Sequence, residues 1–268
     1  MAFSNLTYGV EELSRYQIMP AVLTDKGPLH IKSDKLHYAP CIFNKNKTSL
    51  NWAGYVLKIG HKNLWVNRFQ TLVPSLIPSP HHSSVSAWTG LGGYFSKQMI
   101  AAGFTSTFDP KNQAQQNYFW FQVYPHDAQI VTNLPISIGD KVEIFVASPK
   151  MNQYHITFGL PDKHEGLLVP PDMTKSSKIK RTSANFIVEA PTEGKQVRSL
   201  ANFGTITFEL CLSHIYGEFA KQIPLNALIP VTMATKSKVI KAQPSGLAYS
   251  PTVPSKVTFD FNVNWQHE

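Results

Sequence analysis

The sequence predicts an all-β protein, a sandwich of antiparallel sheets with little helix. Three observations predict this class: several segments alternate apolar and polar residues with a period of two, turn residues separate these segments, and no stretch sustains an apolar 3.6-residue period. Strands that are not joined by crossover helices are expected to form antiparallel sheets packed face to face.

Four segments show the alternation most clearly: 141–147, 153–159, 205–211 and 256–264. In 205–211, for example, Ile206, Phe208 and Leu210 are expected on one face of a half-buried strand. Sequences rich in Pro, Gly, Asp and Ser separate the strands, at 78–80, 137–140 and 191–194. The segment closest to a helical pattern is 217–223, where we expect one short helix.

The length of 268 residues suits one large domain with a substantial core. We expect residues 49–268 to form the sandwich and the less regular residues 1–48 to be an N-terminal extension packed on it. With 16% charged and 12% aromatic residues, the composition suits a globular β protein and argues against a disordered chain. We expect a monomer.

The net charge of +8 raises the possibility of a nucleic-acid partner, which the charge pattern disfavours. Lys and Arg are scattered, and their one dense run, 175–181, carries no aromatic residues. We interpret that run as an exposed basic loop and expect no nucleic-acid partner. The sequence has no continuous run of 18 apolar residues, so we expect no membrane span.

The sequence offers no metal or cofactor motif. His81 and His82 lie in a Pro/Ser loop, where solvated histidines are more common than metal ligands. Cys41 and Cys211 could form one disulfide or remain free and buried. Glu11 and Glu12 stand where a signal peptide needs an apolar core, so the chain is expected either to be cytoplasmic or to have lost a leader.

Two segments could carry chemistry. In 117–125, alternation puts one aromatic, amide-bearing set on a single face, which suits either a wet surface or the floor of a groove that binds peptide or sugar: Tyr118, Trp120, Gln122 and Tyr124. In segment 182–191, Glu189 ends an apolar run and stands shortly before Pro191. A carboxylate at a strand end is usually a solvated surface group, and the alternative is a general base in a cleft.

Seven motifs together resemble the glutamic peptidases of the eqolisin type. They occur in that family's order and spacing: SLNWAGYV (49–56), VSAWTGLGG (85–93), MIAAG (99–103), YFWFQVYP (118–125), ISIGD (136–140), ANFIVEAP (184–191) and LANFGTITF (200–208). The match covers residues 49–265. It implies two curved antiparallel sheets of the concanavalin A-like kind, a substrate groove on a concave face, and secretion of the protein.

The resemblance also implies an acid-acting endopeptidase that cleaves polypeptides with one Glu and one Gln and no cofactor. Glu189 inherits the role of the catalytic Glu. The position of the catalytic Gln is occupied by Ala101, and Gln98 is expected to face the other way because its offset is odd. Positions that line the family groove are matched here by Trp52, Trp88, Trp120, Gln122 and Tyr124.

Ala101 predicts an inactive form that still binds peptide. Either the Gln was deliberately replaced by Ala, or a natural homologue has lost catalysis. The first explanation is favoured because the other motifs, including the Glu, are retained. Glu189 is expected in a partly hydrated polar groove, where its carboxyl group can stay ionised in acid. Fungal relatives carry acids at the positions of Tyr118, Gly92 and Gln122, so the pH optimum is expected to differ. The alternative function is a noncatalytic sandwich that binds peptide or glycan.

Overall fold

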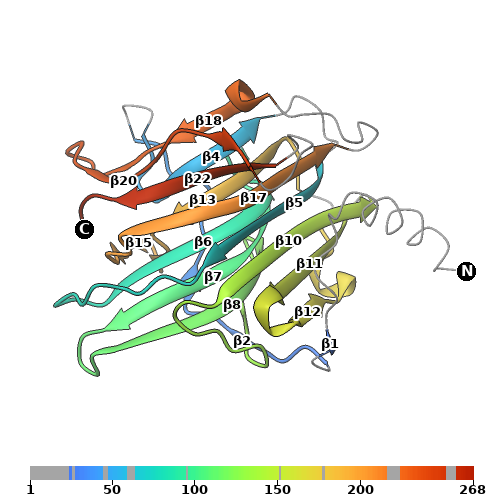
Figure 1. Ribbon diagram of the computed structural model, residues 1–268, viewed down its shortest axis with the longest axis horizontal. Helices are drawn as coiled ribbons and strands as arrows, with labels where there is room; N and C mark the ends of the chain where they lie inside the picture. The colour runs from blue at the N-terminus through green and yellow to red at the C-terminus, as the bar shows by residue number, and fades with distance from the viewer. Residues whose placement is uncertain are drawn as a thin grey trace, which may run out of the picture.

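The computed structural model describes residues 24–25, 28–44, 48–58, 64–94, 96–150, 152–176, 179–215, 224–251 and 258–268. Two large, mainly antiparallel sheets pack face to face and form nearly all of the regular structure (Figure 1). The prediction of an all-β sandwich with little helix is therefore confirmed. Within these residues, no helix is both long and apolar enough to span a bilayer.

The first sheet has ten strands in the order β1–β12–β11–β10–β5–β17–β22–β20–β19, with β21 beside β22. Strand β1 pairs in parallel with β12. The bounds are β1 Thr24–Asp25, β5 Leu64–Leu72, β10 Lys141–Lys150, β11 Gln153–Leu160, β12 Glu165–Val169, β17 Thr205–Ile215, β19 Met233–Ala234, β20 Ile240–Pro244, β21 Ala248–Tyr249 and β22 Phe259–Trp265.

The second sheet has nine strands in the order β18–β4–β13–β6–β7–β8–β9–β2, with the short β16 parallel to β6. The bounds are β2 Ile31–Ser33, β4 Trp52–Lys58, β6 Ser83–Gly92, β7 Met99–Asp109, β8 Ala114–Tyr124, β9 Gln129–Val131, β13 Ser183–Glu189, β16 Ser199–Leu200 and β18 Leu228–Val231. A small sheet pairs β15 Gln196–Val197, β14 Thr192–Glu193 and β3 Leu36–His37.

Helix is limited, in the part of the chain that the structure describes, to three 3₁₀ turns: η1 Pro161–Lys163, η2 Pro171–Thr174 and η3 Leu225–Ala227. The short helix expected at 217–223 lies outside the described residues. The turn signal at 191–194 lies in a hairpin: residues 192–193 form β14, which pairs with β15 across residues 194–195. Cys41 and Cys211 are both free thiols, so of the two alternatives the unbonded one holds.

The main core lies between the two sheets and is built as the alternation predicts. On β11, Tyr154, Ile156 and Phe158 are all buried there. Strand β17 departs from the prediction: Leu210 does not share the inward face of Ile206 and Phe208. The strand bulges between Phe208 and Cys211, with φ of 50° at Leu210, and Cys211 takes the core position instead.

Candidate active site

A second aromatic cluster lies on the opposite face of the second sheet, away from the main core. Strand β8 separates the two: Phe119 and Phe121 join the main core, whereas Trp120 joins the second cluster. Trp52 of β4 and Trp88 of β6 lie in the same cluster, with ring centroids 4.9 Å apart and planes at 79°. This face therefore brings together indoles from three separate strands.

Glu189, the last residue of β13, lies among these indoles and is fully buried. Its Oε2 accepts a hydrogen bond of 2.8 Å from the indole Nε1 of Trp88. Its Oε1 accepts one of 3.0 Å from the backbone N–H of Ala39 and one of 3.2 Å from Nδ2 of Asn51. Each carboxylate oxygen is thus held by a donor of fixed direction.

The electrostatic setting of Glu189 favours its neutral form. Burial raises the pKa of the Glu189 carboxyl group well above its usual range, while hydrogen bonds from Ala39, Asn51 and Trp88 pull that pKa down. The expectation of a partly hydrated groove around Glu189 is wrong for this structure, since none of the residue is exposed.

Ala101 lies on β7, opposite Gly90 of β6 and Gln122 of β8. Gly90 in turn pairs with Asn185 of β13, four residues before Glu189. An even offset keeps Asn185 and Glu189 on one face, so the Ala101 methyl group and the Glu189 side chain share a face. Ala101 is fully buried in the aromatic cluster.

The carboxamide of Gln122 is also on this face and almost completely buried. Its Oε1 accepts from the backbone N–H of Tyr38 at 3.1 Å, and its Nε2 donates to the carbonyl oxygen of His126 at 2.7 Å. Tyr124, two residues on, packs half-buried against the same cluster. Gln98 lies one residue before β7 begins.

The face is covered by an extended segment, Asp34–Phe43, which we call the strap. It follows β2, which pairs with β9 at the edge of the sheet, and it includes β3. In Figure 1 the blue trace after β2 passes behind β8, β7 and β6. The ring of Tyr38 stacks on Trp120, with centroids 3.4 Å apart and planes 2° apart. The strap therefore covers the candidate site and separates it from solvent.

Asn51 connects the strap to the carboxylate, and reasoning from sequence missed it. Besides its bond to Glu189, its Nδ2 donates to the carbonyl oxygens of Ala39 and Pro40 at 3.3 and 3.4 Å. Its Oδ1 accepts from the backbone N–H of Ile42 at 2.9 Å. The one available signal was its place beside Trp52 in the motif SLNWAGYV. Tyr38 and Ala39 were missed because no pattern in 1–48 indicated where that segment packs.

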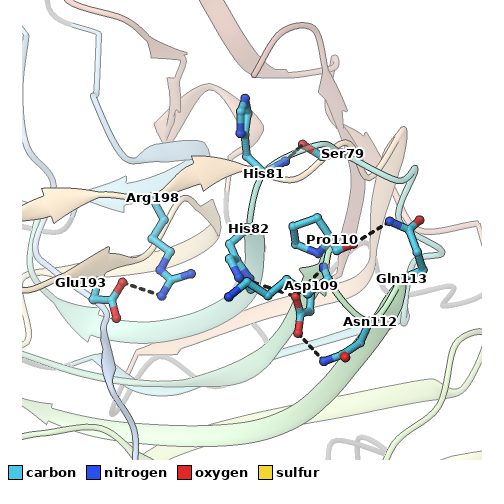
Figure 2. A network of polar contacts seen from close by, with 10 residues as sticks. Ser79, His81, His82, Asp109, Pro110, Asn112, Gln113, Glu193 and Arg198 are labelled. Carbon is cyan, nitrogen blue, oxygen red and sulfur yellow. Dashed lines mark hydrogen bonds and ion pairs between the residues drawn. The ribbon is translucent and has the colours of Figure 1, made fainter.

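A cavity of about 810 Å³ opens beside the strap, where β7 and β8 continue beyond the tryptophans. Strap residues Asp34 and Leu36 line one side of it, and Thr107 and Gln116 line the sheet side. Figure 2 shows part of its polar rim, where His82 points toward Asp109 at 3.6 Å. Nearby in the same view, Arg198 donates to Glu193.

The described residues contain no group of three His, Cys, Asp or Glu side chains placed to hold a metal ion. The groups that surround the site are the buried carboxyl group of Glu189, the neutral donors around it and the flat aromatic surfaces.

Comparisons with known proteins identify the family and match the fold. The model of the Peptidase A4 family matches residues 50–241. The fold is similar to scytalido-glutamic peptidase with a transition state analog inhibitor, at a TM-score of 0.65 and 17% identity over 82% of this chain and 100% of that one. It is also similar to SCP-B, a member of the eqolisin family, in complex with the tripeptide Ala-Ile-His, at a TM-score of 0.61 and 15% identity over 82% and 100%.

A further similar structure is aspergilloglutamic peptidase from Aspergillus niger, at a TM-score of 0.54 and 16% identity over 69% of this chain and 99% of that one. A search of curated protein sequences found no significant match.

Proposed function

Because the chain belongs to the Peptidase A4 family, we propose that it has the site of an acid-acting glutamic endopeptidase, in which Glu189 is the general base and acid. The observation that carries the proposal is the setting of Glu189. It is a buried carboxyl group between indoles, and it accepts a hydrogen bond from the main chain of an extended peptide segment.

In the proposed reaction, the Glu189 carboxylate takes a proton from water, and the water oxygen bonds to the carbonyl carbon of the peptide. The C–N bond then breaks, and Glu189 returns the proton to the leaving amine. Water reaches the carboxylate only when the strap has left the groove.

The second catalytic group of such a pair, a carboxamide donating to the developing oxyanion, is missing at Ala101. Loss of one such donor lowers a rate by roughly 10²–10³, so we propose that the chain is essentially inactive as it stands. In this state the neighbouring carboxamide of Gln122 accepts from the Tyr38 N–H and donates one of its two Nε2 hydrogens to the carbonyl oxygen of His126.

We further propose that the groove still binds polypeptide. The similar structures of scytalido-glutamic peptidase and SCP-B hold a transition state analog and a tripeptide. In this chain, the face holds the extended main chain of the strap and the ring of Tyr38, which supports binding of a peptide with an aromatic side chain. The same two observations favour the second candidate function, a noncatalytic peptide-binding sandwich.

The test is the Ala101→Gln variant, assayed on a denatured protein from about pH 2 to 7, the range over which a catalytic carboxyl group titrates. Ala101 is fully buried beneath the strap. A Gln side chain at this position must therefore displace the strap. We therefore include Ala101→Gln combined with Tyr38→Ala, which loosens the strap. Cleavage by either variant supports the peptidase. No cleavage by both variants at every pH favours the noncatalytic binder.

A further inference from the structure

The strap lies across the site with main-chain contacts at consecutive residues. The N–H of Tyr38 donates to Gln122 at 3.1 Å, and the N–H of Ala39 donates to Glu189 at 3.0 Å. The carbonyl oxygen of Ala39 accepts from the indole Nε1 of Trp52 at 2.9 Å. Any peptide offers these main-chain groups, so the same donors and acceptors are available to a peptide from another molecule.

The one strap side chain that is stacked on the floor of the site is Tyr38. Its ring lies parallel to Trp120, and its hydroxyl group is 2.7 Å from Oγ1 of Thr105. The same hydroxyl group donates to Oδ2 of Asp34, at the start of the strap, at 2.9 Å. Trp120 is itself fixed, because its Nε1 donates to Oγ of Ser86 at 3.0 Å. A flat, immobile surface with a hydroxyl partner at its end is selective for an aromatic ring, and for tyrosine above the others.

We propose that the strap occupies the groove in the position of a substrate, with the Tyr38–Ala39 bond where a substrate's cleaved bond lies, and that Trp120 and Thr105 form the subsite for an aromatic residue preceding that bond. The proposal rests on the proposed function. Its positional argument is that Glu189 contacts the nitrogen of Ala39. That nitrogen is the one that leaves, with the proton from Glu189, if the bond is hydrolysed.

Gln122 is then a substrate-binding residue. Its Oε1 holds the N–H of the aromatic residue, and the bond from its Nε2 to the carbonyl oxygen of His126 fixes the direction of the amide. Gln122 accepts from the N–H of Tyr38, and Glu189 accepts from the N–H of the next residue, Ala39. These two bonds fix the register of the peptide along the groove.

Binding tests the subsite without any need for catalysis. The probe is a fluorescent peptide Leu-His-Tyr-Ala-Pro-Ser, which copies residues 36–41 with Ser in place of Cys41, and its partner has Ala in place of Tyr. The protein is the full chain carrying Tyr38→Ala. We expect the Tyr peptide to bind at least about tenfold more tightly, since a stacked, buried ring is lost from the other. The unaltered chain should bind the Tyr peptide more weakly, because its own strap competes.

Two further variants of the Tyr38→Ala chain test whether Trp120 and Thr105 cause the preference for the Tyr peptide. Trp120→Leu should abolish the preference for Tyr over Ala, provided that a thermal melt shows it folded. Thr105→Val, which keeps the shape of the side chain, should reduce a preference for a Tyr peptide over the matching Phe peptide, because the hydroxyl group then keeps only its partner Asp34. Equal binding of the Tyr and Ala peptides overturns the proposal, as does a preference that survives in folded Trp120→Leu. If Trp120→Leu does not fold, a Tyr-over-Phe preference that is unchanged by Thr105→Val overturns it.

The bonds cut by the Ala101→Gln variants separate this inference from the proposed function. Cleavage after aromatic residues supports both. Cleavage with no aromatic residue before the cut bonds overturns the subsite and leaves the peptidase standing. No cleavage, with the Tyr preference in binding intact, refutes the peptidase and with it the cleaved-bond position, while Trp120 and Thr105 stand as a peptide-binding subsite.

Discussion

Replacing Asn51 with Ala tests whether one buried amide holds the strap on the carboxylate. The side chain is fully buried, and it makes three well-formed bonds: to Glu189 at 3.2 Å, from the Ile42 N–H at 2.9 Å and from Oγ of Ser49 at 3.0 Å. The variant leaves the Ile42 amide and one lone pair of Glu189 without this partner. Since each buried or part-buried group that loses a partner costs up to about 1–3 kcal/mol, we expect a loss of about 2–4 kcal/mol in the free energy of unfolding.

Urea unfolding followed by tryptophan fluorescence measures this loss, because three of the tryptophans lie in the affected cluster. The matched control is Asn112→Ala, which removes an exposed amide whose Nδ2 donates to Asp109. We expect the control to lose less than about 1 kcal/mol. An Asn51 variant that loses no more than the control refutes the reasoning that the Asn51 network holds the strap.

Three other predictions concern the same region. Burial raises the pKa of Glu189 above 4.5, its value in an unstructured chain, so its contribution to stability is fully present below that pH and is lost as pH rises through the folded pKa. Glu189→Gln should flatten this fall in urea unfolding from acid to neutral pH, and parallel curves would contradict it. The Cys41 thiol, whose pKa burial raises to about 12, should resist a thiol reagent in the folded chain near pH 8 and react readily in Tyr38→Ala, where the strap is loosened; equal reaction rates would argue against the closed strap. Gly103→Ala should cost about 1–3 kcal/mol, because a β-carbon there would lie 2.4 Å from both the Ala87 carbonyl oxygen and the Trp88 β-carbon, and an unchanged melting temperature would show that β6 and β7 can separate.

Local alternation was sufficient to predict much of the fold. A strand with one face in the core repeats every two residues, so β11 and both faces of β8 could be assigned from residue type alone. Leu210 could not be assigned to a face, because the bulge in β17 shifts the alternation of inward and outward residues and no sequence signal marks its position. Sheet order also depends on which strands meet, which no local pattern specifies.

The candidate site was only partly predictable. The motifs placed Glu189, Ala101 and the tryptophans on one face, where the structure has them. The covering of that face depends on contacts between residues far apart in sequence, such as Ala39 with Glu189. For this reason the sequence suggested a hydrated groove, and the structure shows a buried one that Tyr38 and Ala39 fill.

The initial rate of hydrolysis of a denatured protein by the Tyr38→Ala/Ala101→Gln chain tests the central claim most directly. We predict a rate at least about 10² above that of Tyr38→Ala alone, because the oxyanion donor is restored. Adding Glu189→Gln should return the rate to background. Equal rates with Ala and Gln at position 101, or a rate that survives Glu189→Gln, would contradict the assignment of Glu189 and the residue at 101 as a catalytic pair.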